Sequence, residues 1–436
     1  MTHAAPPRPR PRRALALWLI AAGLLLGIGL LTLAVRTELQ GVPVAALGAD
    51  GVTATPALLE RGAQLAAAGN CMACHTARGG EPWAGGRPVN TPFGPIYASN
   101  LTPDPETGLG RWSAGDFRRA LLHGQSRDGR LLYPAFPYNH TTRMTTEDVD
   151  ALYAHLRTLP PVVQPAREHG LRFPFNTQAA LALWRILYFT PGTYQPDAAR
   201  SAEWNRGAYL VTGVAHCAAC HAERDVFGGG SVDRFGGGLM PDGRWWAPSL
   251  HDPAEGGTQA WGVDATVALL AGGRNAHASG QASTLGPMAE VVLHGTQHLP
   301  ESDLRAMAVY LAELPVQPVK QPGFEPAPDA VLTRGGRLYE QHCAQCHGDA
   351  GEGATDAYPP LAGHRAVTQS SPVNAVQAIL SGGFAPATRA HPRPYGMPPY
   401  RSTLSDDDVA AVTSFIRQSW GNRAGEVTAL DVARLR

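Results

Sequence analysis

The sequence predicts a mainly α-helical protein in which an N-terminal membrane helix precedes three tandem domains with long loops. Three observations support this prediction. One unit, built around the motif Cys-X-X-Cys-His, occurs three times in the 436 residues. Glycine and proline are plentiful, at 49 and 38 residues, which is typical of short helices joined by turn-rich loops. An uncharged, almost wholly apolar run over residues 14–35 precedes the first unit.

The apolar run is long enough to cross a bilayer as a helix, since roughly 20 residues suffice. A secretory signal has a shorter apolar region followed by a small-residue cleavage site, and no such site follows directly here. We therefore expect an uncleaved transmembrane anchor over residues 14–35 rather than a cleaved signal. Arginines in the basic segment 1–13, at positions 8, 10, 12 and 13, predict a cytoplasmic N-terminus and place the remaining chain outside the cytoplasm.

The repeated motif uses all six cysteines of the chain, each pair being followed by a histidine: Cys71, Cys74 and His75; Cys217, Cys220 and His221; Cys343, Cys346 and His347. This motif attaches c-type haem, the two thiols binding the vinyl groups and the histidine binding the iron as proximal ligand. A structural zinc site would need two Cys-X-X-Cys pairs close together, and a disulfide framework would need a denser set of cysteines. We therefore predict three covalently bound haem c groups. Because cytochrome c matures on the outer face of the bacterial inner membrane, we expect the haem domains in the periplasm.

Each unit repeats the same order of helices around its motif. It opens with an Arg-Gly pair on a short helix, and the glycine is expected to let that helix cross another one closely. A middle helix ends at a glycine stop near residues 124, 272 and 382. A closing helix begins with acidic residues and carries an aromatic side chain on the face that meets the first helix; these helices cover residues 148–156, 303–311 and 408–416. This order describes a class I cytochrome c domain.

Prolines and composition set the domain boundaries. We expect the first domain over residues 52–165, an interdomain connection over 166–198, the second domain over 199–318, a Pro-rich linker over 319–328, the third domain over 329–422 and a tail over 423–436. The connection contains an apolar stretch at 182–189. We interpret it as a helix buried between domains, with a docking element for a partner or membrane surface as the alternative.

Methionine as the distal ligand raises the potential of a haem and suits electron transfer. Among the seven methionines, Met288 and Met397 lie in Gly/Pro loops before the second and third closing helices, so we assign them to the second and third haems. In the first unit, Phe136 or Pro137 aligns with Met397. Its iron is then bound by His140, bound by Met144 through a shifted loop, or left open.

The chain resembles the membrane-bound triple-haem cytochrome c subunit of bacterial periplasmic dehydrogenases, such as the quinohaemoprotein alcohol dehydrogenase and the flavin-dependent gluconate, sorbitol and fructose dehydrogenases. Related subunits accompany molybdenum hydroxylases. The resemblance rests on residues 91–97, 100–104, 108–113, 133–135, 201–210 and 419–422. Members of this family commonly have methionine where Phe136 stands. The resemblance implies a catalytic partner of PQQ, flavin or molybdenum type, and ubiquinone or a terminal oxidase as acceptor.

We therefore predict a subunit that conducts electrons and does not itself transform the organic substrate. The formal net charge is zero, so nothing indicates nucleic-acid binding, and neither a nucleotide-binding G-X-G-X-X-G nor a His-Glu-X-X-His stands out. Two alternatives stay open. One is a haem enzyme, of peroxidase or thiosulfate-oxidising type, with substrate access at the first haem. The other is a soluble electron shuttle, which would require cleavage of the N-terminal segment.

Overall fold

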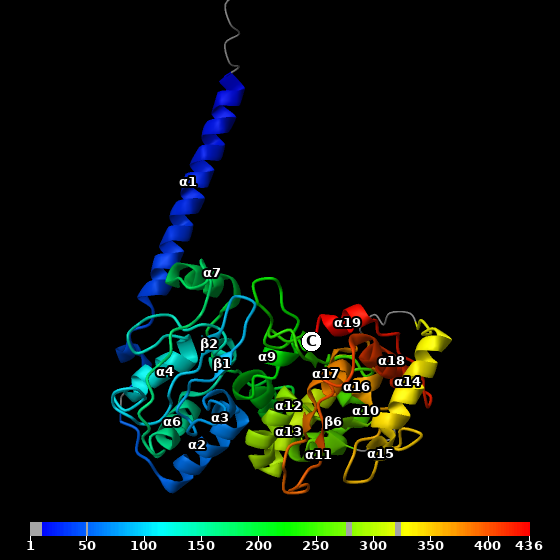
Figure 1. The fold of residues 1–436 in the computed structure, drawn as a ribbon. Coiled ribbons are helices and arrows are strands. Elements are labelled where there is room, and N and C mark those ends of the chain that lie inside the picture. The colour runs from blue at the N-terminus through cyan, green and yellow to red at the C-terminus, as the bar shows by residue number, and fades with distance from the viewer. Residues whose placement is uncertain (1–10, 49–50, 276–280, 319–323) are drawn as a thin grey trace, which may run out of the picture.

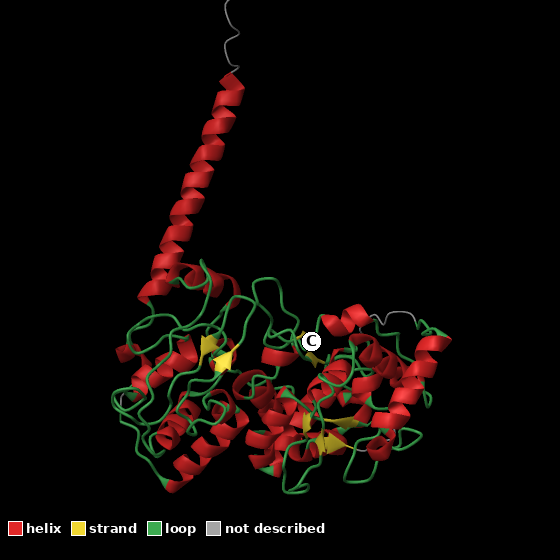
Figure 2. Ribbon diagram, viewed as in Figure 1, coloured by secondary structure: helices red, strands yellow, loops and turns green. Residues whose placement is uncertain are grey.

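The protein is mainly helical, with three units arranged below a long N-terminal helix (Figures 1 and 2). The computed structural model describes residues 11–48, 51–275, 281–318 and 324–436. Arg8, Arg10 and the first half of the predicted linker, residues 319–323, lie outside this range. Helix α1 (Pro11–Gln40) leaves the first unit and extends away from the remaining chain (Figure 1). In the described part of the chain, it is the one helix long and apolar enough to cross a membrane.

The opening and closing helices of each unit form a crossed pair: α2 (Pro56–Ala68) with α6 (Thr146–Leu156), α8 (Ala202–Tyr209) with α13 (Glu301–Ala312), and α14 (Asp329–His342) with α18 (Asp406–Gln418). A glycine lies at every crossing, as the sequence predicted. A Cβ atom on Gly62 would lie 2.0 Å from the carbonyl oxygen of Ala151, and Gly207 and Gly335 have equivalent neighbours at 1.9 and 2.2 Å. Only glycine therefore permits these backbones to approach so closely.

An ion pair reinforces each crossing. The arginine that precedes the crossing glycine reaches the aspartate in the first turn of the closing helix. These pairs are Arg61 with Asp148, Arg206 with Asp303 at 2.7 Å, and Arg334 with Asp408 at 2.7 Å. The expected aromatic side chain over the glycine is present as Tyr310 and Phe415 in the second and third units. In the first unit His155 takes that place, whereas Tyr153 packs on Phe117 with ring centroids 5.4 Å apart.

The middle helices end at glycines with positive φ. They are α4 (Ala114–His123), α11 (Val263–Gly272) and α17 (Val373–Ser381), and they are followed by Gly124 at φ 60°, Gly273 at φ 76° and Gly382 at φ 58°. In the second unit the stop is therefore Gly273, one residue after the predicted Gly272. Positive φ favours glycine because it lacks a Cβ atom.

Shorter elements connect these helices. The remaining helices are η1 (Val44–Leu47), α3 (Cys71–Cys74), α5 (Tyr138–Thr141), α7 (Gln178–Tyr188), the π-helix η2 (Leu210–Val214), α9 (Ala218–His221), α10 (Thr258–Trp261), α12 (Pro287–His294), η3 (Thr296–His298), α15 (Ala344–His347), α16 (Arg365–Thr368) and α19 (Ala429–Ala433). Antiparallel strand pairs join β1 (Pro88–Val89) to β2 (Ile96–Tyr97), β3 (Gly238–Leu239) to β4 (Trp246–Ala247), β5 (Arg274–Asn275) to β6 (Ala282–Ser283), and β7 (Gly383–Phe384) to β8 (Gly396–Met397).

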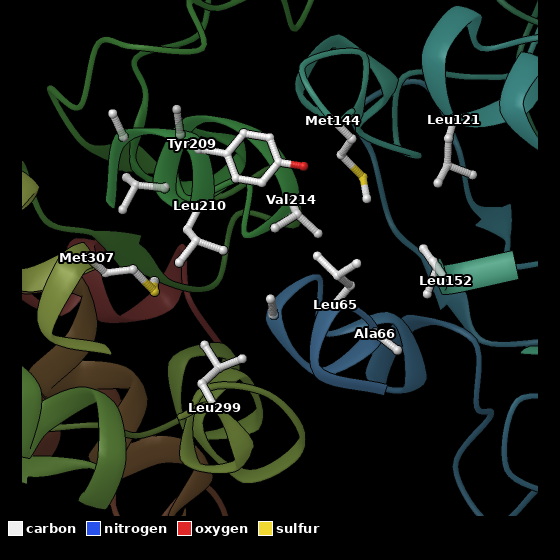
Figure 3. Packing of buried hydrophobic residues seen from close by; sticks show 14 of the residues in the cluster. Leu65, Ala66, Leu121, Met144, Leu152, Tyr209, Leu210, Val214, Leu299 and Met307 are labelled. Atoms are coloured by element: carbon white, nitrogen blue, oxygen red, sulfur yellow. The ribbon is translucent and has the colours of Figure 1, made fainter. Parts of the chain in front are cut away.

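The first and second units share one hydrophobic core. In Figure 3, Leu65 and Met144 of the first unit face Val214 and Tyr209 of the second. The third unit has a separate core. That core includes Val427 and Val432, both almost fully buried, so the predicted C-terminal tail packs onto the third unit through α19.

The predicted interdomain connection agrees with the favoured interpretation only in part. Its helix α7 packs against α1 at the side of the first unit (Figure 1), and its Trp184 and Tyr188 bond to residues 227 and 225 of the second unit. Leu181 and Ala182 turn inward and bury against Leu131 and Val35. Leu187, on the opposite face, is 62% exposed. The alternative interpretation, a docking element, therefore stays open.

Candidate haem-attachment sites

Each Cys-X-X-Cys-His motif is folded as a single helical turn, in α3, α9 and α15. The three histidines are oriented in the same way. The Nδ1 atom of His75 donates to the carbonyl of Ser99 at 2.7 Å, that of His221 to Pro248 at 2.8 Å, and that of His347 to Pro359 at 2.9 Å. A hydrogen bond at Nδ1 fixes the tautomer and leaves the Nε2 lone pair for a metal. The histidines therefore fit the proximal side of a haem iron.

The cysteines suit attachment to an apolar ring. None of the six forms a disulfide. Burial raises the pKa of Cys71 and of Cys217 to about 12, and that of Cys343 to about 11. Such thiols are neutral at neutral pH, unlike zinc ligands or catalytic nucleophiles, which are thiolates. Among the described residues, no group of three or more His, Cys, Asp or Glu side chains is placed to hold a metal ion.

A direct hydrogen bond links the first two attachment segments. His216, the residue before Cys217, donates from Nε2 to the carbonyl of Gly69 at 3.0 Å, two residues before Cys71. Asn70 and His216 both have positive φ, 46° and 41°, so the residue before each of these two motifs has an unusual backbone conformation. The first and second motifs therefore lie side by side, as the shared core requires.

Arg87 forms a second link at the same place. Its guanidinium donates to the carbonyl of Ala73, inside the first motif, at 2.7 Å. It also pairs with Glu290 of α12 at 2.7 Å. Helix α12 carries Met288, the predicted distal ligand of the second haem. Arg87 therefore connects the first motif to the helix that carries this candidate ligand.

The two candidate methionine ligands lie on adjacent segments of the second and third units. Met288 is half-buried in the first turn of α12, whereas the sequence predicted a position in a loop. Met397 is half-buried in β8, paired with Gly383. A cavity of about 240 Å³ separates α12 from the β7 segment; it is lined on one side by residues 285, 286, 289, 290 and 293 and on the other by residues 382–386.

In the first unit the two candidate ligands have different surroundings. Met144 is fully buried three residues after Thr141, whose hydroxyl donates to the carbonyl of Leu121. Thr296 makes the same contact with Leu270 in the second unit, and Leu299 follows it three residues later. Met144 therefore occupies the packing position that Leu299 fills in the second unit, where it is also buried.

His140 is also buried, and one ring nitrogen has a hydrogen-bond partner. Its Nδ1 atom donates to the carbonyl of Thr212, in the second unit, at 3.1 Å. Burial, together with the neighbouring His216, lowers the pKa of His140 to about 3. The ring is therefore neutral at neutral pH, with its Nε2 lone pair free of a proton. Phe136, which takes the methionine position in the alignment, is half-buried against the shared core.

Sequence reasoning missed the groups that orient the motifs. The carbonyls of Ser99, Pro248 and Pro359 lie 24, 27 and 12 residues after their histidines. Because this spacing varies, the sequence does not predict which carbonyl each histidine contacts. The Arg–Asp pairs could have been predicted from the sequence. Every unit has an arginine in its Arg-Gly pair and an acidic residue at the start of its closing helix. Taken alone, those acids predict only a helix N-terminus.

Comparison with known proteins gives a consistent result. The sequence model of the Cytochrome c family matches residues 59–160 and 332–420. The alcohol dehydrogenase (quinone) cytochrome c subunit of Gluconacetobacter polyoxogenes is 38% identical over 402 residues, which cover 88% of this chain and 85% of that protein. The gluconate 2-dehydrogenase cytochrome c subunit of Pantoea cypripedii is 36% identical over 88% of this chain and 90% of that protein.

A further relative is much longer than this chain. It is one of the subunits of nicotinate dehydrogenase from Pseudomonas putida, and it is 41% identical over 397 residues. These residues cover 89% of this chain but 32% of that protein.

Proposed function

We propose a specific electron path from the premise that this chain belongs to the family of cytochrome c subunits of membrane dehydrogenases, whose members transfer electrons. In this proposal, three haem c groups carry electrons from a periplasmic catalytic subunit to ubiquinone or a terminal oxidase. The family sequence model covers the first and third units and not the middle one. The repeated crossing of α8 with α13 and the matching bond at His221 support a third cytochrome c domain there.

We propose that the six cysteines hold the haems and that His75, His221 and His347 bind the irons on the proximal side. Bound haem supplies one-electron iron chemistry. The protein then contributes orientation: each backbone carbonyl holds an imidazole in one tautomer, and the crossed helices hold the attachment turn. The shared Nδ1 hydrogen bond is the observation that carries this proposal. Intact-mass measurement of the purified protein should show three added haem masses, and two or fewer would contradict it.

We assign the distal side of the second and third irons to Met288 and Met397. For the first iron we favour His140 over Met144, because Met144 fills the packing position that Leu299 occupies in the second unit. His140 has a neutral ring whose Nδ1 already donates a hydrogen bond, which leaves Nε2 for iron.

Two matched variants test the ligand of the first iron. We expect His140→Ala to convert one of three ferric haems from low to high spin by electron paramagnetic resonance. Met144→Leu, which keeps the buried volume, should leave the spectrum unchanged. High spin in Met144→Leu alone would reverse the assignment. One high-spin haem in the unmodified protein would instead favour an open first iron, and with it a haem enzyme.

The relatives narrow the class of partner without selecting one. They are subunits of alcohol, gluconate, fructose and nicotinate dehydrogenases. We propose that this chain accompanies a catalytic subunit of PQQ, flavin or molybdenum type. A mild-detergent pull-down of the native complex, followed by cofactor analysis of the co-purified subunit, tests this. The chain oxidising an organic substrate alone would contradict the proposal.

We propose that α1 stays in the protein as an anchor in the bacterial inner membrane, with its N-terminus in the cytoplasm and the haem units in the periplasm. The apolar window Leu15–Gln40 supports this placement. Intact-mass measurement of the mature protein distinguishes the anchor from a cleaved signal. A mature N-terminus after residue 35 would make the protein a soluble shuttle.

A further inference from the structure

The helix α7 is apolar on both of its faces. Its one charged residue, Arg185, is 5% exposed and turns inward, where it pairs with Glu38 of α1 at 2.8 Å. Leu183, Ile186 and Leu187 face outward, and Leu187 is 62% exposed. A helix on the surface of a soluble protein places its charges outward and its apolar side chains inward. The outward face of α7 therefore suits an apolar environment better than water.

Apolar side chains from two other segments extend this face. Phe173 is 81% exposed, and Val226 and Phe227, in the loop after the second motif, are 84% and 54% exposed. The indole of Trp184 donates to the carbonyl of Phe227 at 3.0 Å, which holds the loop against α7. We call Phe173, Leu183, Ile186, Leu187, Val226 and Phe227 the apolar patch.

Further contacts fix the patch as one surface. The hydroxyl of Tyr188 donates to Asp225 at 2.6 Å, which anchors the start of the loop. The ring of Phe175 lies 4.3 Å from that of Phe93, and a Cβ atom on Gly228 would lie 3.6 Å from the same Phe93 ring. The segment around Phe173 and the loop around Phe227 are therefore neighbours through Phe93. Clustered exposed apolar groups mark interaction sites, whereas scattered ones do not.

The position of the patch identifies what covers it. Val35, the last residue of the apolar run, packs against the buried side of α7. Glu38, three residues later, pairs with Arg185. The bilayer surface crossed by α1 therefore lies level with α7, which Figure 1 shows at the base of α1. Trp184 and Tyr188, with ring centroids 5.1 Å apart, are the residue types that gather at membrane–water interfaces.

We infer that the apolar patch docks onto the outer leaflet of the same bilayer that α1 spans. The inference rests on the proposed anchor and adds a second membrane contact, at which side chains enter the boundary between headgroups and acyl chains. Two contacts fix the tilt of the protein, which one helix alone would not. The loop with Val226 and Phe227 follows His221 closely, so docking also holds the second attachment site near the lipid surface.

Footprinting tests this docking directly. The full-length holoprotein would be placed in lipid nanodiscs without any partner and exposed to hydroxyl radicals, and oxidation would be read by mass spectrometry. We expect oxidation of Phe173, Leu187 and Phe227 to fall about fivefold relative to Phe384, which is 69% exposed in the third unit, because lipid excludes the radical. Equal oxidation of the four would overturn the inference.

A variant with charged residues in the apolar patch gives a second, independent test of the docking. Leu187→Asp combined with Phe227→Asp should restore oxidation of Phe173 in nanodiscs, while liposome flotation through α1 persists. Phe384→Asp is the matched control and should leave Phe173 protected. Protection seen only in the native complex, and not in nanodiscs, would assign the patch to a protein partner and reject the lipid surface. Oxidation of leucines within residues 15–33 beside a protected patch would reject the anchor but keep the docking.

Discussion

Buried apolar side chains of the first and second units form one core, whereas hydrogen bonds join the separate cores of the second and third. Leu65 and Val214 belong to one core across the first junction (Figure 3). At the second junction, the amide of Asn374 accepts from the backbone of Trp246 at 2.9 Å and donates back at 2.8 Å. Ser370 donates to Glu255 at 2.7 Å. We therefore expect the first two units to unfold as one, with the third unit attached to them.

The difference matters for electron transfer. A shared core holds two attachment sites at a fixed separation, because packed interiors deform little. Hydrogen bonds between separate cores leave relative motion open. We expect the first two haems to keep one geometry, while the third unit adjusts its position against the second.

The largest expected effect comes from the helix crossings. Gly62→Val would place a side chain 2.0 Å from a backbone oxygen, which we expect to cost about 3 kcal/mol or more. Differential scanning calorimetry should show the first and second units losing stability together. Gly335→Val should lower only the transition of the third unit. Gly272→Ala, at a helical glycine with open space around it, is the control. If the first unit unfolded independently of the second, the shared core would not couple their stabilities as we expect.

A smaller effect is expected from Tyr209→Phe. The hydroxyl of Tyr209 donates to the buried Asp148 at 2.5 Å across the first junction, and it accepts from the amide of Thr145. Removing it takes one hydrogen bond from the Asp148 carboxylate, which keeps its ion pair with Arg61, and takes the acceptor from the Thr145 amide, at a cost of about 1–3 kcal/mol. By calorimetry, the transition of the shared core should move to a lower temperature, and the transition of the third unit should stay in place. Tyr188→Phe, whose bond to Asp225 is exposed, should shift neither by a comparable amount.

The polar junction should respond more weakly. Asn374→Ala removes both hydrogen bonds to Trp246, and we expect a loss of about 1–2 kcal/mol in the attachment of the third unit. The measurement is amide hydrogen exchange, which should accelerate at Trp246 while the cores stay protected. Ser381→Ala, which removes a bond to Gln377 within the third unit, is the control. Faster exchange throughout the third core would mean that the junction stabilises the unit itself.

The smallest effect concerns pH and the third unit. The hydroxyl of Ser405, followed by Arg334, holds the pKa of Asp408 below its ordinary value. A lowered carboxyl pKa adds stability above the unfolded pKa of about 4, and this stability is lost as pH falls through the folded pKa. The melting temperature of the third unit should therefore drop slightly more below pH 4 than that of Asp408→Asn. Identical pH profiles would show that Asp408 contributes nothing.

Much of the fold was readable because its signals are local. The motif fixes its own helical turn, and the glycines at 62, 207 and 335 predicted the close crossings. The middle helices ended within one residue of their predicted stops. Two expectations need correction. The side chain over Gly62 is His155, which follows Asp148 by the same seven residues that separate Tyr310 from Asp303 and Phe415 from Asp408, whereas Tyr153 packs on Phe117. Met288 lies in the first turn of a helix that Arg87 ties to the first motif.

By itself, the sequence determined the repeated unit, its attachment residues and the apolar N-terminal run, because each is encoded by neighbouring residues. Only the tertiary structure decided how the units join and what α7 faces. Whether Leu65 meets Val214, or Asn374 meets Trp246, depends on side chains that lie more than a hundred residues apart. Arg185 likewise looks like a surface charge until Glu38 is found beside it. The burial of Arg185 depends on the assembled chain, so the local pattern around it does not report it.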